Sequence, residues 1–293
     1  LNDVSAEEMT VITAKDIEAE GPAENAYDLE AELNKVVGLE SVKNYIRSLN
    51  ARLMVQEQRK KHGLKVNATQ TLHMIFMGNP GTGKTMMART VANVLFNMGI
   101  ISTNKLVETD RSGLVAGYVG QTALKTREVI ESALNGVLFI DEAYALAQGG
   151  NNDFGQEAID TLVKMMDDNR DRLVVILAGY YNDMQNFLNQ NAGLKSRFPN
   201  VIQFEDYSTE ELLIIADKMY KEQGYVLSDD AVTLLKQIFE SGKKQPQFGN
   251  GRYVRNIFEK SLNSQAMRLS RSSTMSTDEL SMITADDIKE VLA

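Results

Sequence analysis

A glycine-rich segment, Gly78-Asn79-Pro80-Gly81-Thr82-Gly83-Lys84-Thr85, matches the pattern G-x-x-x-x-G-K-[ST] at every fixed position. Glycines in this pattern allow successive backbone N–H groups to surround phosphate oxygens, and the positive end of a following helix faces the same anion. Lys84 is placed to bridge the β- and γ-phosphates of a nucleotide, and the Thr85 hydroxyl is placed to bind Mg²⁺. The segment therefore predicts a site for a nucleoside triphosphate and Mg²⁺.

Two adjacent carboxylates, Asp141 and Glu142, follow the apolar run Val137–Ile140. Such a run indicates a buried strand, and open α/β sheets bind ligands at the carboxyl ends of their strands. We expect Asp141 to hold Mg²⁺ through its water shell and Glu142 to polarise the attacking water. An isolated pair of this kind is commonly a helix cap or a solvated strand end. Together with the glycine-rich segment, it predicts nucleotide hydrolysis.

Short apolar runs predict the strands that position these segments. They lie at 71–77, 105–109, 137–140, 173–178 and 201–204. Helical periodicity fills several of the gaps, as at Ile159, Leu162, Val163 and Met166, which fall on one helical face. Strands that alternate with helices predict an α/β fold with a parallel five-stranded sheet flanked by helices.

After Phe204 the strand pattern stops and helical patterns follow. Ser208 and Glu211 form a potential capping box, and Gly224 is placed to end the helix that it opens. Further helical patterns lie at 229–239, 253–269 and 285–292. The sequence predicts an α/β nucleotide-binding domain over residues 25–206 and a small all-helical domain over residues 207–293.

The N-terminal residues repeat a pattern found near the other end of the chain. Residues 5–17 read SAEEMTVITAKDI and residues 276–288 read STDELSMITADDI, with seven of 13 positions identical. One interpretation is a pair of similar helix starts, because T-A-x-D-I caps a helix well. We favour the other, in which residues 1–24 are a linker or the tail of a preceding tandem module. Leu1 is not methionine, so we expect a fragment or a processed chain.

Composition indicates a globular cytoplasmic protein. Apolar residues make up 43% of the chain and charged residues 24%, and cysteine is absent, so disulfide and thiolate chemistry are excluded. There is no apolar run of about 18 residues and no signal segment, which predicts no association with a membrane. The formal net charge of −9 disfavours nucleic acid as a partner.

With these motifs in place, the chain resembles the AAA+ ATPases, and within them the branch that holds the red-type rubisco activase CbbX and the sporulation protein SpoVK. The resemblance extends from about Asn25 to about Ala285. Beside the glycine-rich segment it rests on residues 37–43, 114–122, 136–144, 178–180, 193–198 and 249–252. It implies a P-loop AAA+ fold with a helical lid domain, ATP as the nucleotide, and a homo-oligomeric ring, most often a hexamer, with ATP bound between subunits.

The resemblance also implies roles for three arginines. Arg197 matches the arginine finger, which reaches the γ-phosphate held by a neighbouring subunit; the alternative is an ordinary surface cation. Arg252 matches the sensor-2 arginine of the lid, which touches the nucleotide of its own subunit. Arg255 lies on the same helical face and is the rival candidate for that role.

Two further assignments follow the family pattern. A polar residue past the fourth strand, sensor 1, orients the attacking water; Asn182 is our choice, with Tyr180 or Tyr181 as alternatives. Val37 and Gly38 match the region that packs on adenine, although a hydrophobic turn before a core helix accounts for them almost as well.

Tyr118 and Val119 lie between Gly117 and Gly120. In AAA+ motors that thread proteins, an aromatic residue followed by an aliphatic one and glycine projects into the central pore. An exposed aromatic ring can grip varied side chains, and flanking glycines let the loop move. The alternative is a tyrosine packed beneath its own loop. A second pore loop at 149–153 is explained equally well as a flexible linker.

Three functions compete on this basis. The first is a ring that remodels or unfolds an unidentified target protein, with Tyr118 gripping the substrate. The second is an ATPase of the loader type that handles nucleic acid, which the acidic balance disfavours. The third is a slow nucleotide-dependent scaffold or switch, which the intact Glu142 and Arg197 disfavour. Tandem modules in a longer chain are an alternative source of the neighbouring subunit.

Overall fold

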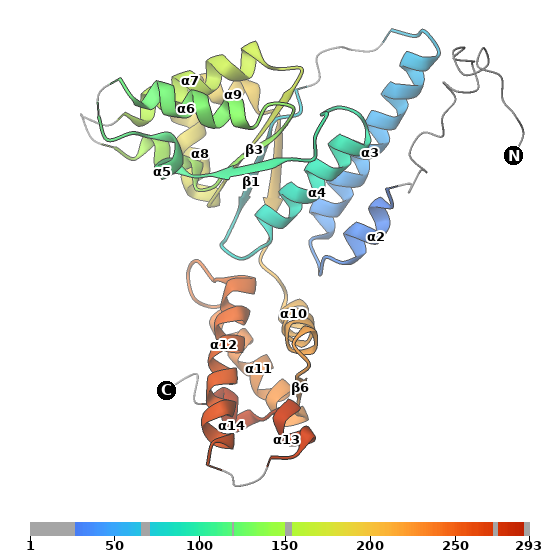
Figure 1. Ribbon diagram of the computed structural model, residues 1–293, viewed down its shortest axis with the longest axis vertical. Coiled ribbons are helices and arrows are strands. Elements are labelled where there is room, and N and C mark those ends of the chain that lie inside the picture. Colours follow the sequence, from blue (N-terminus) through green and yellow to red (C-terminus); the bar gives the residue numbers. More distant parts are fainter. Residues whose placement is uncertain (1–26, 66–70, 119, 150–153, 272–274, 290–293) are drawn as a thin grey trace, which may run out of the picture.

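The computed structural model describes residues 27–65, 71–118, 120–149, 154–271 and 275–289. These residues form an α/β domain and a smaller helical domain below it in Figure 1. The expected linker or module tail at residues 1–24 lies outside the described residues, as do Val119 and most of the possible second loop at 149–153.

The central sheet has five parallel strands in the order β2-β3-β4-β1-β5. Their bounds are β1 Met74–Gly78, β2 Leu106–Thr109, β3 Gly136–Ile140, β4 Leu173–Gly179 and β5 Asn200–Phe204. Every residue of β1, β3 and β4 is buried, so these strands appear in the sequence as unbroken apolar runs. The predicted five-stranded parallel sheet is confirmed.

The first strand begins at Met74, later than the predicted Thr71. The side-chain amide of Asn200 donates hydrogen bonds to the carbonyl oxygens of Thr71 and His73, both at 3.0 Å. The Asn200 side chain, and not the backbone of a neighbouring strand, therefore provides the hydrogen bonds to these two carbonyl oxygens.

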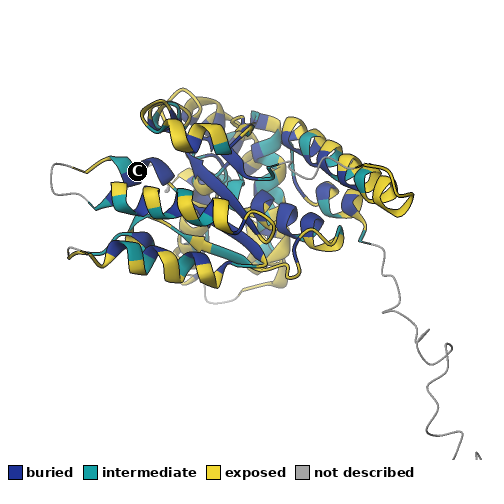
Figure 2. Cartoon of the chain, turned by 90° about the horizontal axis from the view of Figure 1, so that it is seen from above, coloured by how far each residue is buried: buried dark blue, intermediate teal, exposed yellow. Residues whose placement is uncertain are grey.

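Helices cover both faces of the sheet (Figure 1). On one face lie α2 (Leu29–Asn34), α3 (Glu40–Lys61) and α4 (Lys84–Asn97); on the other lie α6 (Thr122–Ser132), α7 (Gly155–Asp168), α8 (Tyr181–Gln190) and α9 (Ala192–Arg197). Met74 and Phe76 pack into the first layer, whereas Ile75 and Met77 pack into the second, as the alternation along a strand requires. Figure 2 shows the buried strands between helices whose outer faces are exposed.

The linker from β5 to the second domain leads directly into a capped helix. Ser208 Oγ accepts a hydrogen bond from the Glu211 backbone N–H at 3.1 Å, and Glu211 Oε2 accepts one from the Ser208 backbone N–H at 2.7 Å. This is the predicted capping box. Gly224, with φ of 78°, follows the end of that helix. The helices of this domain are α10 Thr209–Glu222, α11 Asp229–Gly242, α12 Asn250–Leu269, α13 Thr277–Ser281 and α14 Ala285–Lys289.

The second domain is helical as predicted, with one correction to the expectation that it is entirely so. A parallel pair of short strands, β6 (Val226–Leu227) and β7 (Met282–Ile283), joins its two ends. The pairing continues from the Ser228 backbone N–H to the Ile283 carbonyl oxygen at 3.0 Å. A strand of two residues has no visible periodicity, so the sequence pattern did not reveal it. None of the helices described here is long and apolar enough to cross a bilayer.

Candidate nucleotide-binding site

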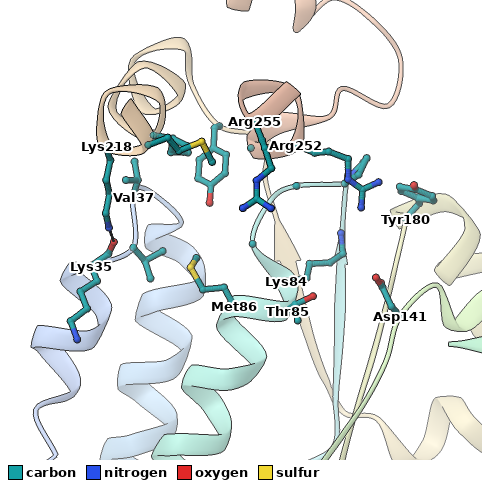
Figure 3. Close-up of a pocket in the computed structure, with 18 of the residues that line it drawn as sticks. Lys35, Val37, Lys84, Thr85, Met86, Asp141, Tyr180, Lys218, Arg252 and Arg255 are labelled. Atoms are coloured by element: carbon teal, nitrogen blue, oxygen red, sulfur yellow. Dashed lines mark hydrogen bonds between the residues drawn. The ribbon is translucent and has the colours of Figure 1, made fainter. Parts of the chain in front are cut away.

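A cavity of about 500 Å³ opens at the carboxyl ends of β1, β3 and β4, with residues of both domains in its walls. Figure 3 shows Lys84, Thr85 and Asp141 on one side, facing Arg252 and Arg255 on the other. The sequence-predicted residues that line it are Val37, Pro80, Gly81, Gly83, Lys84, Thr85, Asp141, Glu142, Arg252 and Arg255.

The glycine-rich loop joins β1 to α4 in a conformation that needs glycine. Gly81 and Gly83 have φ of 71° and 88°, in the left-handed region that other residues rarely adopt. A Cβ atom at Gly81 would lie 2.2 Å from the carbonyl oxygen of Gly249 in the lid. The backbone of the loop therefore packs directly against the lid, and α4 begins directly at Lys84, which leaves its first N–H groups facing the cavity.

Lys84 brings a positive charge to the base of the loop. Its Nζ donates hydrogen bonds to the carbonyl oxygens of Gly78 at 2.9 Å and Asn79 at 2.8 Å. Burial lowers the pKa of Lys84, Asp141 opposes this effect, and Arg252 adds to it. Lys84, Asp141 and Arg252 come from three separate elements and line the same cavity.

Asp141 and Glu142 leave β3 in a sharp turn. Asp141 Oδ1 accepts a hydrogen bond from the Glu142 backbone N–H at 3.0 Å. Glu142 has φ of 47° and ψ of 43°, a left-handed conformation that costs a residue with a side chain roughly 1–2 kcal/mol. The turn leads into the 3₁₀ helix η2 (Ala143–Ala147) and leaves both carboxylate residues in the cavity wall. Strain of this kind is common at functional sites.

Tyr180, and not Asn182, lines the cavity next to these carboxylates. Because β4 continues through Gly179, only the next residue still lies at the sheet edge, and Asn182 is exposed in the first turn of α8. Burial raises the pKa of Tyr180, and Glu142 adds to the effect. The phenol consequently stays protonated and can donate a hydrogen bond. Of the three residues considered for sensor 1, Tyr180 lines the cavity, whereas Asn182 and Tyr181 do not.

The end of the cavity away from Asp141 is mainly apolar. Val37 and Met86 lie there (Figure 3), and Ile215 and Met219 also line the cavity. Lys218 Nζ donates a hydrogen bond to the Lys35 carbonyl oxygen at 3.1 Å and ties α10 to the segment before α3. Sequence reasoning missed the α10 residues, although the spacing of Ile215 and Met219 places them on one helical face.

Three predicted binding residues do not line the cavity and brace its walls instead. Thr82 is fully buried, and its Oγ1 donates a hydrogen bond to the Asn79 carbonyl oxygen at 2.8 Å. The Asn79 side chain points to Asp206, with Nδ2 at 3.0 Å and 2.9 Å from the two carboxylate oxygens. Gly38 has φ of 59° and packs against Glu211, where a Cβ atom would lie 2.1 Å from Oε1.

The two lid arginines approach the loop from the start of α12. The Gly251 backbone N–H donates a hydrogen bond to the Gly81 carbonyl oxygen at 3.0 Å, which holds this helix against the loop. Arg252 lies on the side of Tyr180, and Arg255 lies further toward Met86 (Figure 3). Of the two, Arg252 acts on the pKa values of both Lys84 and Tyr180, so it is the arginine nearer to the charged centre.

Arg197 and Tyr118 lie away from the cavity. Arg197 ends α9 and pairs with Asp167 at the end of α7. Tyr118 is 74% exposed in the loop between α5 (Arg111–Leu114) and α6, so it is not packed beneath that loop. The base of the loop is fixed, since Thr122 Oγ1 accepts a hydrogen bond from the Ala116 backbone N–H at 3.0 Å.

Comparison with known protein families gives two matches that divide the chain near the linker. A family model described as "ATPase family associated with various cellular activities (AAA)" matches residues 74–206. A second model, described as "AAA lid domain", matches residues 208–293.

Several characterised proteins are similar over most of the chain. Stage V sporulation protein K of Bacillus subtilis is 46% identical over 264 residues, covering 89% of this chain and 82% of that protein. Protein CbbX of Cereibacter sphaeroides is 43% identical over 284 residues, covering 96% and 92%. The ESX-1 secretion system protein EccA1 of Mycobacterium tuberculosis is 44% identical over 280 residues, which cover 91% of this chain but only 49% of EccA1.

Solved structures share the fold at low sequence identity. A mutant of Thermotoga maritima RuvB superposes with a TM-score of 0.59 at 19% identity, covering 89% of this chain and 71% of RuvB. The AAA domain of FIGL-1, solved in complex with ADP, gives a TM-score of 0.59 at 19% identity, covering 87% and 81%. At this identity the likeness concerns the fold alone.

Proposed function

The chain belongs to the AAA family of ATPases, and we propose that it assembles into a ring whose ATP hydrolysis remodels a target protein. One observation carries the proposal. Lys84, Asp141, Glu142 and Arg252 converge on a single cavity, while Arg197 and Tyr118 lie outside it. This arrangement supports two separate roles: the residues in the cavity act on the bound nucleotide, and Arg197 and Tyr118 contact neighbouring molecules.

The cavity suits Mg²⁺-ATP by the chemistry of its walls. The left-handed backbone at Gly81 and Gly83 lets successive N–H groups of the loop turn toward one anion, and both residues line the cavity. Thr85 and Asp141 offer the oxygen donors that Mg²⁺ prefers, and the ion keeps its remaining positions for water and phosphate. When bound, Mg²⁺ would neutralise negative charge on the phosphates. The apolar end around Val37 and Met219 suits the adenine ring.

Each polar residue then has a defined task. Glu142 accepts a hydrogen bond from the attacking water and draws its proton, and Tyr180 orients that water from the neighbouring strand end. Lys84 and Arg252 stabilise the negative charge that develops on the phosphate oxygens. The strained turn at Glu142 fixes the direction of its carboxylate before substrate arrives.

Arg197 completes the site of an adjacent subunit. It lies at the amino ends of the strands, beside Thr71 and His73, whereas the nucleotide cavity is at the carboxyl ends. A single chain therefore does not bring Arg197 to its own nucleotide. Such an arginine supplied in trans raises the rate by about 10³–10⁵-fold in related phosphoryl transfers. The ring is thus required for turnover.

Tyr118 contacts the target protein, and the structure offers a path from the nucleotide to its loop. Arg111 Nη1 donates a hydrogen bond to the Ala145 carbonyl oxygen at 2.7 Å. Ala145 belongs to η2, which begins directly after Glu142, and Arg111 begins α5, which leads to Tyr118. A shift of Glu142 during hydrolysis can therefore reach the loop through two short, packed helices.

The molar mass of Glu142→Gln, measured by light scattering with and without Mg²⁺-ATP, tests the proposal. This variant retains Lys84 and Asp141 but should not hydrolyse ATP, so we expect it to accumulate as a ring. Lys84→Ala is the matched control and should stay unassembled because it does not retain the triphosphate. A monomer of Glu142→Gln at every ATP concentration contradicts the self-assembling ring.

A further inference from the structure

The side chains of Asn79, Asp206 and Asn250 form a hydrogen-bonded cluster where the two domains meet. Asn79 belongs to the phosphate loop, Asp206 to the linker between β5 and α10, and Asn250 to the first turn of α12. Asn79 Nδ2 donates to both carboxylate oxygens of Asp206, at 3.0 Å and 2.9 Å, and Asn250 Nδ2 donates to Asp206 Oδ1 at 2.7 Å. One carboxylate thus receives an amide from each domain.

Asn250 is held more firmly than its position at a helix start requires. It is completely buried, and its φ of 46° lies in the left-handed region, which asparagine tolerates better than most residues. Its Oδ1 accepts a hydrogen bond from the Tyr207 backbone N–H at 2.9 Å, and its Nδ2 also donates to the Phe248 carbonyl oxygen at 3.0 Å. The side chain therefore fixes the linker and the start of α12 relative to each other.

A backbone contact lies beside this cluster. The Gly251 N–H donates to the Gly81 carbonyl oxygen at 3.0 Å, and the missing Cβ of Gly81 makes room for Gly249 and Arg252. Asn250 Nδ2 also donates to the Pro80 carbonyl oxygen at 3.4 Å. The phosphate loop consequently meets α12 in three ways, once through Asp206 and twice directly. Arg252 is two residues from Asn250, so its position over the loop depends on these contacts.

The side chain of Asp206 is the acceptor that joins the two asparagines. Both present their N–H₂ groups to it, and a carboxylate can accept from both. An amide at position 206 can still join them if the Asn79 amide turns over and accepts through its own oxygen. Alanine at position 206 removes the acceptor and breaks both connections.

We propose that Asp206 is a positioning residue that couples the phosphate loop to the lid, so that a displacement of Asn79 on phosphate binding moves Asn250 and with it Arg252. The proposal rests on the proposed ATPase function, because it concerns how that site responds to nucleotide. It adds a residue that does not line the nucleotide cavity.

The test compares three variants in a chain labelled for distance measurement. The chain contains no cysteine, so cysteines introduced at the exposed positions Glu128 on α6 and Gln237 on α11 carry fluorophores at known sites. Asp206→Ala breaks the cluster by removing the shared acceptor. Asn79→Asp combined with Asp206→Asn keeps it with the charge moved, because the amide at 206 then donates to the carboxylate at 79 and accepts from Asn250. Glu205→Gln removes an exposed neighbouring charge and serves as control.

We expect the labelled parent to change its energy-transfer efficiency on addition of Mg²⁺ and a non-hydrolysable ATP analogue. Asp206→Ala should lose most of that change and lower kcat about tenfold, with KM altered by less than about threefold. The double variant should keep both readouts, and Glu205→Gln should match the parent. A purely structural role of Asp206 predicts a lower thermal midpoint without selective loss of the response.

Two results overturn the proposal. One is an Asp206→Ala protein that folds, keeps the full energy-transfer change and keeps kcat. The other is a double variant that stays as impaired as the single one. Failure of the parent chain to bind or hydrolyse ATP is a different outcome, because it rejects the proposed function itself, and the parent is measured first for that reason.

Discussion

Arg197 and Asp167 form a two-point ion pair at the amino ends of β1 and β4, with Arg197 Nε 2.9 Å from Asp167 Oδ1 and Nη2 2.5 Å from Oδ2. Arg197 Nη1 also donates to the Gly193 carbonyl oxygen at 2.9 Å. The guanidinium is therefore oriented within its own chain before any neighbour is present. In the proposed ring, this orientation would reduce the entropy lost when Arg197 exchanges the Asp167 carboxylate for the phosphate of another subunit.

Mixing two inactive variants tests whether Arg197 acts in trans. Glu142→Gln lacks the residue that polarises water, and Arg197→Ala should hydrolyse ATP at least about 10³-fold more slowly than the parent. In rings formed from equal amounts of the two variants, half of the subunits keep Glu142, and half of the neighbours of these subunits keep Arg197. About a quarter of the sites therefore contain both residues, and mixing should restore about a quarter of the parent activity. Lys195→Ala, on the same helix, is the control and should hydrolyse normally. A mixture no more active than its components argues against the trans role.

Arg252 should matter more for turnover than Arg255. Arg252 lines the cavity on the side of Tyr180 and is proposed to contact the phosphates, so Arg252→Ala is expected to lower kcat/KM about tenfold to a hundredfold, because a hydrogen bond to a charged group contributes roughly 1.5–3 kcal/mol. Arg255→Ala should have a smaller effect. Steady-state kinetics of the two variants distinguish them, and equal losses would assign the sensor role to both.

Tyr118 should control the response to protein substrate. Unfolded casein is expected to stimulate ATP hydrolysis by the parent, and Tyr118→Ala should bring the ratio of stimulated to unstimulated rate close to one. Tyr118→Phe should keep most of the stimulation, because the ring supplies the contact area. Phe96 is another exposed aromatic residue, at the far end of α4, and Phe96→Ala provides the control. If casein stimulates ATP hydrolysis by Tyr118→Ala as strongly as it stimulates the parent, the pore-loop role is contradicted.

His73 should make stability fall at acid pH. It is buried, Val175 donates its backbone N–H to Nδ1 at 3.0 Å, and burial lowers the pKa of His73 to about 4. Between pH 6.5 and 4 the unfolded chain binds the proton that the folded chain excludes, so the free energy of unfolding decreases as pH falls through this window. The decrease due to His73 should reach roughly 2–3 kcal/mol near pH 4.5.

His73→Asn isolates this contribution, because its Oδ1 can still accept from Val175 but does not titrate. Urea denaturation of both proteins from pH 7.5 to 4.5 measures it. The stability of the parent should fall relative to the variant as pH decreases. Parallel pH profiles for the two proteins would show that His73 contributes nothing to acid sensitivity.

The features that sequence could reveal are those set by short continuous segments. The phosphate loop is one run from Gly78 to Thr85, and the Asp141–Glu142 pair directly follows its strand, so local pattern was enough to find both. The buried strands were visible because every residue in them is apolar. The capping box at Ser208 was visible because its two residues have a fixed separation.

Features that depend on geometry between segments were not accessible in the same way. Whether Tyr180 or Asn182 reaches the cavity depends on the residue at which β4 ends, and a shift of two residues changes the assignment. The side chain of Asn79 belongs to a predicted binding loop but contacts Asp206, over a hundred residues away in the chain. The two-residue strands β6 and β7 carry no pattern and exist only because the folded lid brings them together.

Because β6 pairs with β7, the lid domain can finish folding only after the central sheet has been synthesised. The chain leaves the ribosome from its N-terminal end, and domains generally fold as they emerge. The central sheet has all of its strands once Phe204 has emerged, whereas the lid core still lacks Ile283 and Ile288, which are both fully buried. Arg252 is carried by a helix of that unfinished lid. The catalytic centre is therefore the last part of the molecule to mature, and a nascent chain stalled before Met282 should contain a complete sheet without a competent ATPase.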